Sequence, residues 1–342
     1  MKIHGRVSEW TPIPAVALTA AIALLWAGTA RAADSITVYS GQHEQTVGKL
    51  VKDFTKRTGV EVKLRSSGEA EMANQILQEG SNSPADVFIA QNPPALEVLR
   101  EKGLFAPVDP ATLRAVRPGS NSPQGAWVGV SARAAVLAYN TDQVKKSALP
   151  KSLLDLAKPA WKGKFGFATT ETDFQPLIAA VTALKGRPVA ERWLTALKQQ
   201  GRVYEDNEAL VAAVNRGEIA TGVMVHYYWF RLRDEIGAKN IHSALHYFAP
   251  RDPGALVDVS GAAALKSSRK AKLAQRFLAY LVSKPAQTII ATTESYEYPL
   301  GRGVTTTKPL RPFGALRPPA VSVSDLGNGR ASLRLLQDVG LL

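Results

Sequence analysis

The chain has 342 residues, 45% of them hydrophobic, with 42 Lys and Arg against 29 Asp and Glu and a formal net charge of +13. This length and composition allow one large domain or two lobes with ample core. The absence of cysteine excludes disulfides, thiol nucleophiles and a lipid-modified cysteine. The basic residues are scattered and are not interleaved with aromatic residues, so the charge indicates a solvated basic surface and no nucleic-acid partner.

The first 33 residues have the pattern of a secretion signal. Lys2 and Arg6 precede an apolar run over residues 15–27, and Ala30-Arg31-Ala32 then matches a small-residue cleavage pattern. An uncleaved N-terminal anchor is the alternative, but the run is shorter than the roughly 20 residues that span a membrane. We therefore predict a signal peptide over residues 1–33 and a periplasmic protein without a lipid anchor.

Strands and helices alternate in the next hundred residues. The apolar patterns predict strands at 35–40, 60–64 and 85–90, with helices from about Gln42 to Gly59, from Glu71 to Glu79 and from Pro94 to Gly103. Such alternation is typical of a parallel α/β sheet. A long β-rich passage then covers residues 127–140.

The middle of the chain repeats this pattern. A strand near 162–170, helices at 174–184 and 209–216, and a strand at 219–225 lead to a helix that begins near His226. A second long β-type passage at 255–265 precedes a helix at 270–282, and a last helix covers 331–339. We interpret the two long passages as crossovers between two α/β lobes with a ligand cleft between them. The predicted lobes are residues 34–135 plus 258–308, and residues 136–257 plus 309–342.

Three strand-to-helix junctions carry polar side chains, and ligands in open α/β sheets lie at the carboxyl ends of strands. The first junction has His43, the second has Gln91 and Asn92, and the third has Tyr227 and Tyr228 side by side. Successive side chains diverge in a strand, but at a turn into a helix both phenols could reach one point. On these residues alone, an aromatic core pair and a surface histidine remain open as alternatives.

Two phenols with an imidazole suggest a metal site. A phenol, with a pKa of about 10, ionises at neutral pH only beside a strong Lewis acid, and ferric iron is such an acid. Zinc would favour His and Cys, and calcium would favour several carboxylates and carbonyls. We expect a histidine ligand to compete with protons near its reference pKa of about 6.5.

Enzyme activity has little support in the sequence. The chain has no G-x-S-x-G, no H-E-x-x-H and no phosphate-binding glycine loop, and spacing singles out no pair of carboxylates. We predict a binding protein that is not an enzyme.

Six collinear segments spread over residues 34–342 resemble the periplasmic ferric-ion-binding proteins of ABC iron importers: ITVYSGQHE, PADVF, KPAWKGKFGF, HYYWF, DPGALVDVSGAAAL and YEYPLG. The resemblance implies a two-lobed type II periplasmic binding protein that captures Fe3+ and delivers it to an inner-membrane permease with its ATPase. It also implies a monomer, with iron ligands at His43, Gln91, Tyr227 and Tyr228.

Two positions depart from that family's pattern. Gln91 stands where relatives usually have glutamate, which removes one negative charge from the site. Relatives hold a synergistic anion, such as carbonate, phosphate or citrate, on a small loop at a helix start. In this chain that loop is Thr170, Glu171 and Thr172, followed by Asp173. Asn207 matches an asparagine of the family's anion site, and Arg133 could pair with an anion. Glu171 and Asp173 either favour the positive end of the helix or supply the missing charge.

Because of these two departures, ligands other than ferric iron and a different protein class remain as alternatives. The same fold could bind thiamine, a polyamine or a phosphonate, and an exported hydrolase on an α/β scaffold is the alternative from a different class. A visible tyrosinate–iron band would distinguish iron binding from both.

Overall fold

The computed structural model describes residues 1–2 and 34–342, so the predicted signal peptide lies outside the described residues. Residues 34–342 form one compact unit that contains every element discussed below. Its strands are β1 (Ser35–Ser40), β2 (Glu61–Ser66), β3 (Val87–Ala90), β4 (Val128–Asn140), β5 (Phe165–Phe167), β6 (Arg202–Val203), β7 (Thr221–Val225), β8 (Ser243–His246), β9 (Val257–Ala264) and β10 (Tyr298–Pro299).

The α-helices of the same unit alternate with these strands along the chain, and the last helix follows β10. They are α1 (Glu44–Thr58), α2 (Glu69–Glu79), α3 (Pro93–Glu101), α4 (Pro110–Arg114), α5 (Phe174–Lys185), α6 (Arg187–Gln200), α7 (Asn207–Arg216), α8 (His226–Ile236), α9 (Ala271–Leu281), α10 (Lys284–Thr292) and α11 (Arg330–Asp338). Local chemistry sets several ends: Gly59 ends α1 in the left-handed region at φ 71°, and the Asp206 side chain accepts from the Ala209 amide to cap α7. None of the described helices has the length and apolar character needed to cross a membrane.

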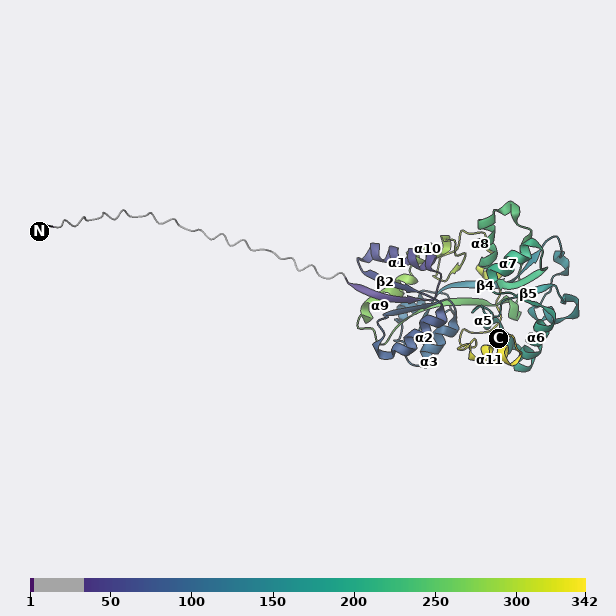
Figure 1. The fold of residues 1–342 in the computed structure, drawn as a ribbon, viewed down its shortest axis with the longest axis horizontal. Coiled ribbons are helices and arrows are strands. Elements are labelled where there is room, and N and C mark those ends of the chain that lie inside the picture. Colours follow the sequence, from purple (N-terminus) through teal and green to yellow (C-terminus); the bar gives the residue numbers. More distant parts are fainter. Residues whose placement is uncertain (3–33) are drawn as a thin grey trace. The chain divides into compact units, whose positions relative to one another are not determined.

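The strands form one mixed sheet in the order β2-β1-β3-β9-β4-β7-β5-β6, and β8 and β10 also pair with β4. Strand β4 belongs to both halves of this sheet. Its first part pairs with β9, from Val128 opposite Ala262 to Ala134 opposite Val257, and its second part pairs with β7, from Ala135 to Tyr139. Figure 1 shows β4 running from the half that carries α1, α2, α3 and α9 into the half that carries α5, α6, α7 and α8.

We call these parts the first and second halves of the sheet. All 13 residues of β4 are buried, as expected for a strand covered on both faces. The buried apolar side chains gather in two clusters, one that includes Phe54, Phe88 and Trp127 and one that includes Phe165 and Trp193. The first cluster extends from the first half into β7, α7 and α8, so the strand ends of both halves pack against a shared core.

The predicted α/β fold class is confirmed. The pairs β1–β2, β1–β3, β5–β6 and β5–β7 are parallel, whereas β4 and β9 pair antiparallel with their neighbours. The two long β passages predicted as crossovers are β4 and β9. Helices α4, α6 and α10 and the strands β6, β8 and β10 are not among the predicted elements, and the boundaries of the two lobes stay a prediction.

Candidate metal centre

The four predicted iron ligands come from three strand ends and lie together. His43 follows β1 at the start of α1, Gln91 follows β3, and Tyr227 and Tyr228 lie in the first turn of α8 after β7. The Tyr227 and Tyr228 rings are 4.4 Å apart, and the His43 ring meets the Tyr227 ring edge-on at 5.2 Å. The Gln91 amide donates to the Tyr227 hydroxyl at 2.7 Å. Side chains from both halves of the sheet thus meet at one point.

The turn from β7 into α8 places the two phenols on one side. Val225 is extended, at φ −91° and ψ 144°, and helical geometry begins at His226. Adjacent helical residues differ by about 100° in direction, compared with about 180° in a strand. Tyr227 is fully buried and Tyr228 is 5% exposed, so both rings are almost entirely removed from water.

Of the two nearby histidines, only one has a free ring nitrogen. The His226 Nδ1 accepts from the Ala134 amide at 3.1 Å, and its Nε2 donates to the Tyr296 carbonyl at 2.8 Å. His226 therefore has a structural role between β4 and the Tyr296 segment. The His43 Nε2 is buried and has no hydrogen-bond partner among the described residues. A buried imidazole nitrogen without a partner is suited to hold a metal.

The surroundings keep His43 neutral. Burial, together with the charges of Arg231 and Arg133, lowers the pKa of His43 to about 3. The expectation that His43 competes with protons near pH 6.5 is therefore wrong. The neutral form that coordinates metals is already present at physiological pH.

The two phenols are also neutral without a metal. Burial raises the pKa of both above the ordinary value of 10, and the charge of Asp173 raises the Tyr227 pKa further. Arg231, whose guanidinium lies over the Tyr227 ring at 4.3 Å, has the opposite effect on that pKa. Only a strong Lewis acid at this point would displace both phenolic protons near neutral pH.

The loop at the start of α5 carries the residues predicted to hold an anion. Thr170 points to the surface and donates to the Glu205 carbonyl at 2.8 Å. The Thr172 hydroxyl accepts from the Asn92 side chain at 3.0 Å, which joins the two halves of the sheet. The backbone N–H of Asn207 donates to the Glu171 carboxylate at 3.3 Å. The Thr170 hydroxyl and the backbone N–H of Asn207 thus bind the chain's own groups.

Asp173 has the most informative place in this loop. Its carboxylate makes no capping bond to α5 and instead accepts from the Asn207 side chain at 3.1 and 3.2 Å. Burial and the nearby Glu171 charge raise the pKa of Asp173 to about 7, although Arg133 opposes them. The carboxylate is close enough to raise the pKa of both tyrosines. Asp173 is therefore a carboxyl group near the phenols that can lose its proton near neutral pH.

Arg133 is fully buried, and buried carboxylates of the same chain balance its charge. It forms ion pairs with Glu297 at 3.3 Å and Asp258 at 3.5 Å and donates to the Asn92 side chain at 2.7 Å. Burial opposes its charge, but Asp258 and Glu297 hold the pKa above the ordinary arginine value. Arg133 therefore links β4, β9 and the loop after β3. Residues 34–342 contain no cluster of three or more His, Cys, Asp or Glu side chains that could hold a metal, so a metal site here depends on the two tyrosines.

Comparisons with known proteins identify the family of the chain. The family model for bacterial extracellular solute-binding proteins matches residues 82–312. The chain is 39% identical to the Fe(3+)-binding periplasmic protein of Serratia marcescens, over 98% of this chain and 99% of that protein. It is also 39% identical to the major ferric iron-binding protein of Neisseria meningitidis serogroup B, over 93% of this chain and 96% of that protein.

Solved structures share the fold. Iron-bound HitA from Pseudomonas aeruginosa is 43% identical with a TM-score of 0.85, covering 90% of this chain and 99% of HitA. A Trichodesmium protein, IdiA (FutA), solved with iron and citrate, is 31% identical with a TM-score of 0.81, covering 90% of this chain and 99% of that one. The chain therefore belongs to the bacterial extracellular solute-binding proteins with the type II periplasmic binding fold, in the group that contains the periplasmic ferric-iron-binding proteins.

Proposed function

We propose that this chain captures ferric iron in the periplasm and delivers it to an inner-membrane ABC permease with its ATPase. The signal peptide over residues 1–33 would export it, and it would act as a monomer without enzymatic activity. The iron-binding relatives support this proposal. The observation that carries it is the buried Tyr227–Tyr228 pair beside the unpartnered Nε2 of His43.

In this proposal the two phenolates supply the dominant ligands and His43 supplies the nitrogen. Ferric iron ionises the buried phenols, so each bound ion releases two phenolic protons to solvent. Because His43 and the tyrosines come from different halves of the sheet, a metal held by both joins those halves. Closure around a ligand is the standard motion of this fold.

The charges in the site balance when Asp173 is included. Two phenolates and one carboxylate match the three positive charges of ferric iron, while Gln91 and His43 are neutral. A buried site that kept a net charge would be costly. We therefore propose that Asp173 replaces the charge lost where relatives carry glutamate at the position of Gln91. Its raised pKa and its effect on both phenols support this role.

Gln91 takes part through its amide. Its Nε2 donates to the Tyr227 hydroxyl, an interaction that also stabilises a phenolate, and rotation of the amide would present its oxygen to the metal. The remaining residues of the predicted anion site, Thr170, Thr172, Asn207 and Arg133, would then support the loop and the closed arrangement. Glu171 would position Asn207.

The test is an iron titration followed by visible absorption. Ferrous salt oxidised by air in bicarbonate buffer supplies ferric iron without an organic acid. We expect one iron per chain and a tyrosinate-to-iron charge-transfer band, which thiamine, polyamine or phosphonate would not give. The Tyr227→Phe/Tyr228→Phe variant should fold normally and show no band. A coloured, fully loaded double variant would overturn the proposal.

A further inference from the structure

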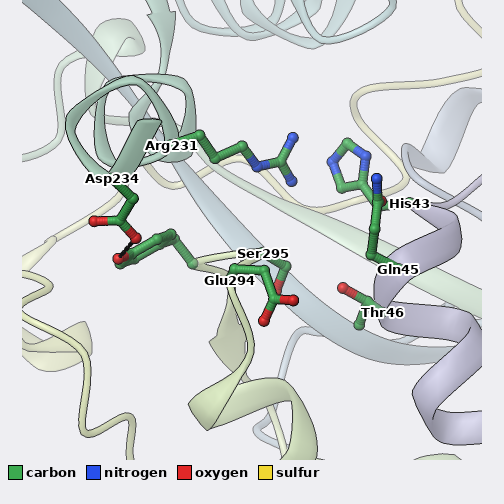
Figure 2. Close-up of a pocket in the computed structure, with 8 residues that line it drawn as sticks. His43, Gln45, Thr46, Arg231, Asp234, Glu294 and Ser295 are labelled. Carbon is green, nitrogen blue, oxygen red and sulfur yellow. Dashed lines mark hydrogen bonds between the residues drawn. The ribbon is translucent and has the colours of Figure 1, made fainter. Parts of the chain in front are cut away.

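A cavity separate from the proposed iron site lies beside β10 and the segment that follows it. The cavity next to the iron site is the one in Figure 2, where the Arg231 guanidinium and the His43 ring face each other. The separate cavity has a volume of about 290 Å³, and none of its lining residues is a proposed iron ligand. One water occupies about 30 Å³ in the liquid, so this space has room for a molecule of roughly ten non-hydrogen atoms.

Most of the wall of this cavity is apolar. Tyr298 is 1% exposed, and its ring meets the Phe313 ring edge-on at 5.5 Å. Tyr298 is held in place because it pairs with Ala132 of β4 and its hydroxyl donates to the Arg311 carbonyl at 2.8 Å. The other apolar side chains of the wall are Pro299, Val304, Leu310 and Pro312. A wall with two aromatic rings favours a flat or branched apolar group as its occupant.

Arg117 is the one charged residue among those that line the cavity. It lies in the loop after α4, where its backbone amide donates to the Leu300 carbonyl at 3.0 Å. Its guanidinium lies over the Phe313 ring at 4.6 Å. This contact places the charge against the aromatic part of the wall.

The guanidinium of Arg117 has no polar partner in residues 34–342. Its Nε is buried and makes no hydrogen bond, and the ion pairs of the described residues do not include Arg117. A buried N–H group without an acceptor costs free energy. A ligand that accepts from this group would remove that cost.

A carboxylate fits this guanidinium better than a phosphate does. Arginine binds a carboxylate through two parallel N–H···O bonds, and Nε–H with a neighbouring Nη–H forms one such pair. A phosphate group carries close to two charges and three acceptor oxygens. The wall offers one cation for these, and the Thr306 hydroxyl already donates to the Ala291 carbonyl at 2.9 Å. The apolar wall beside Arg117 therefore suits a ligand with one carboxylate and an apolar body.

We propose that this cavity binds a small organic monocarboxylate with an aromatic or branched apolar body. Arg117 pairs with the carboxylate, and the Tyr298 and Phe313 rings contact the body. The site is built without any proposed iron ligand, so it takes its ligand whether or not iron is bound. The chain thus has a second small-molecule site, of different chemistry from the first.

The experiment titrates para-fluorophenylacetate into the purified protein and follows binding by fluorine NMR. This probe has one ring and one carboxylate, and we expect one saturable site with the same affinity in the presence and absence of ferric iron. The neutral para-fluorophenylacetamide has nearly the same shape and should bind at least tenfold more weakly. A loss of this difference between acid and amide is the signature expected when the charge of Arg117 is removed.

Two variants locate the site. Arg117→Gln should weaken binding of the acid at least tenfold and leave acid and amide with equal affinity. Thr305→Trp, at an exposed residue that lines the cavity, should fill it and abolish binding. Arg114→Gln, at an exposed arginine of α4 that does not line the cavity, is the matched control and should behave as wild type. Circular dichroism and thermal melting check that each variant is folded.

The outcomes separate this proposal from the proposed iron function. Absence of saturable binding to wild type, equal binding of acid and amide, or unchanged binding in Arg117→Gln and Thr305→Trp would overturn the monocarboxylate site. Competition by inorganic phosphate as strong as that by unlabelled phenylacetate would overturn the assignment to a ligand with an apolar body. All three variants should keep the visible iron band of wild type. If wild type binds the acid but gives no iron band, the iron function fails and the monocarboxylate site stands.

Discussion

Replacing Asp173 with asparagine should make the iron-free protein more stable and the iron site weaker. Asparagine has nearly the same shape, and its side-chain oxygen can still accept from Asn207. The carboxylate is 8% exposed, and its burial raises the pKa in the folded protein to about 7 from 3.8. The folded protein thus holds this proton more tightly than the unfolded chain does. The resulting penalty on folding grows as pH rises above 3.8 and is fully developed above 7.

The size of the effect follows from the two pKa values. One pKa unit corresponds to about 1.4 kcal/mol, so ionised Asp173 costs on the order of 4 kcal/mol at pH 8 and on the order of 2 kcal/mol at pH 5. Asp173→Asn removes this cost. We expect the free energy of unfolding of the iron-free protein to rise at both pH values, with the larger gain at pH 8. Urea denaturation of wild type and variant measures this difference.

Iron binding should change in the opposite direction. Without the carboxylate the site keeps one unbalanced positive charge, so we expect at least a tenfold loss of ferric affinity in citrate-free buffer. A gain in stability with a loss of binding is typical of residues selected for function. If the stability change is the same at pH 5 and pH 8, the burial argument for Asp173 is refuted. Unchanged iron affinity would show that Asp173 does not balance the metal charge.

The other predictions concern protons and the remaining ligands. At fixed free ferric-ion activity, affinity should rise about 100-fold per pH unit above pH 7, because two phenolic protons are released. A tenfold rise would mean that one phenol binds. His43→Ala should weaken iron binding and reduce the compaction seen by solution scattering. Wild-type binding should show no protonation step near pH 6.5, because the pKa of His43 is about 3. Gln91→Glu should restore the iron affinity that Asp173→Asn loses, because it returns one negative charge to the site, as measured by chelator competition in anion-free buffer. No recovery in the double variant would count against the charge-balance account.

Much of the fold could be predicted because hydrophobic periodicity reports burial directly. The alternation of buried strands with amphipathic helices placed β1, β3 and α1 close to their observed bounds, and Gly59 indicated the end of α1. Helices α4, α6 and α10 were missed, although each has a proline in its first turn. Those prolines were a signal that could have revealed all three helices.

The site residues that follow strands could be predicted from the sequence. The residues whose orientation depends on side-chain packing could not. His43, Gln91 and the tyrosine pair all follow strands, so the rule for ligand position in α/β sheets finds them. The sequence could not show which acid in the loop before α5 turns inward, because that depends on the contact between Asp173 and Asn207. Nor could it show that the guanidinium of Arg231 lies over Tyr227. One helical turn separates these two residues, and that spacing was the available signal.

A crystal structure of the iron-loaded protein, with the metal located by anomalous scattering at the iron edge, tests the central claim most directly. The account predicts one iron bound by the oxygens of Tyr227 and Tyr228 and by the Nε2 of His43, with the Asp173 carboxylate in contact with the site. Iron bound elsewhere, or iron in this site without either tyrosine oxygen as a ligand, would contradict the account.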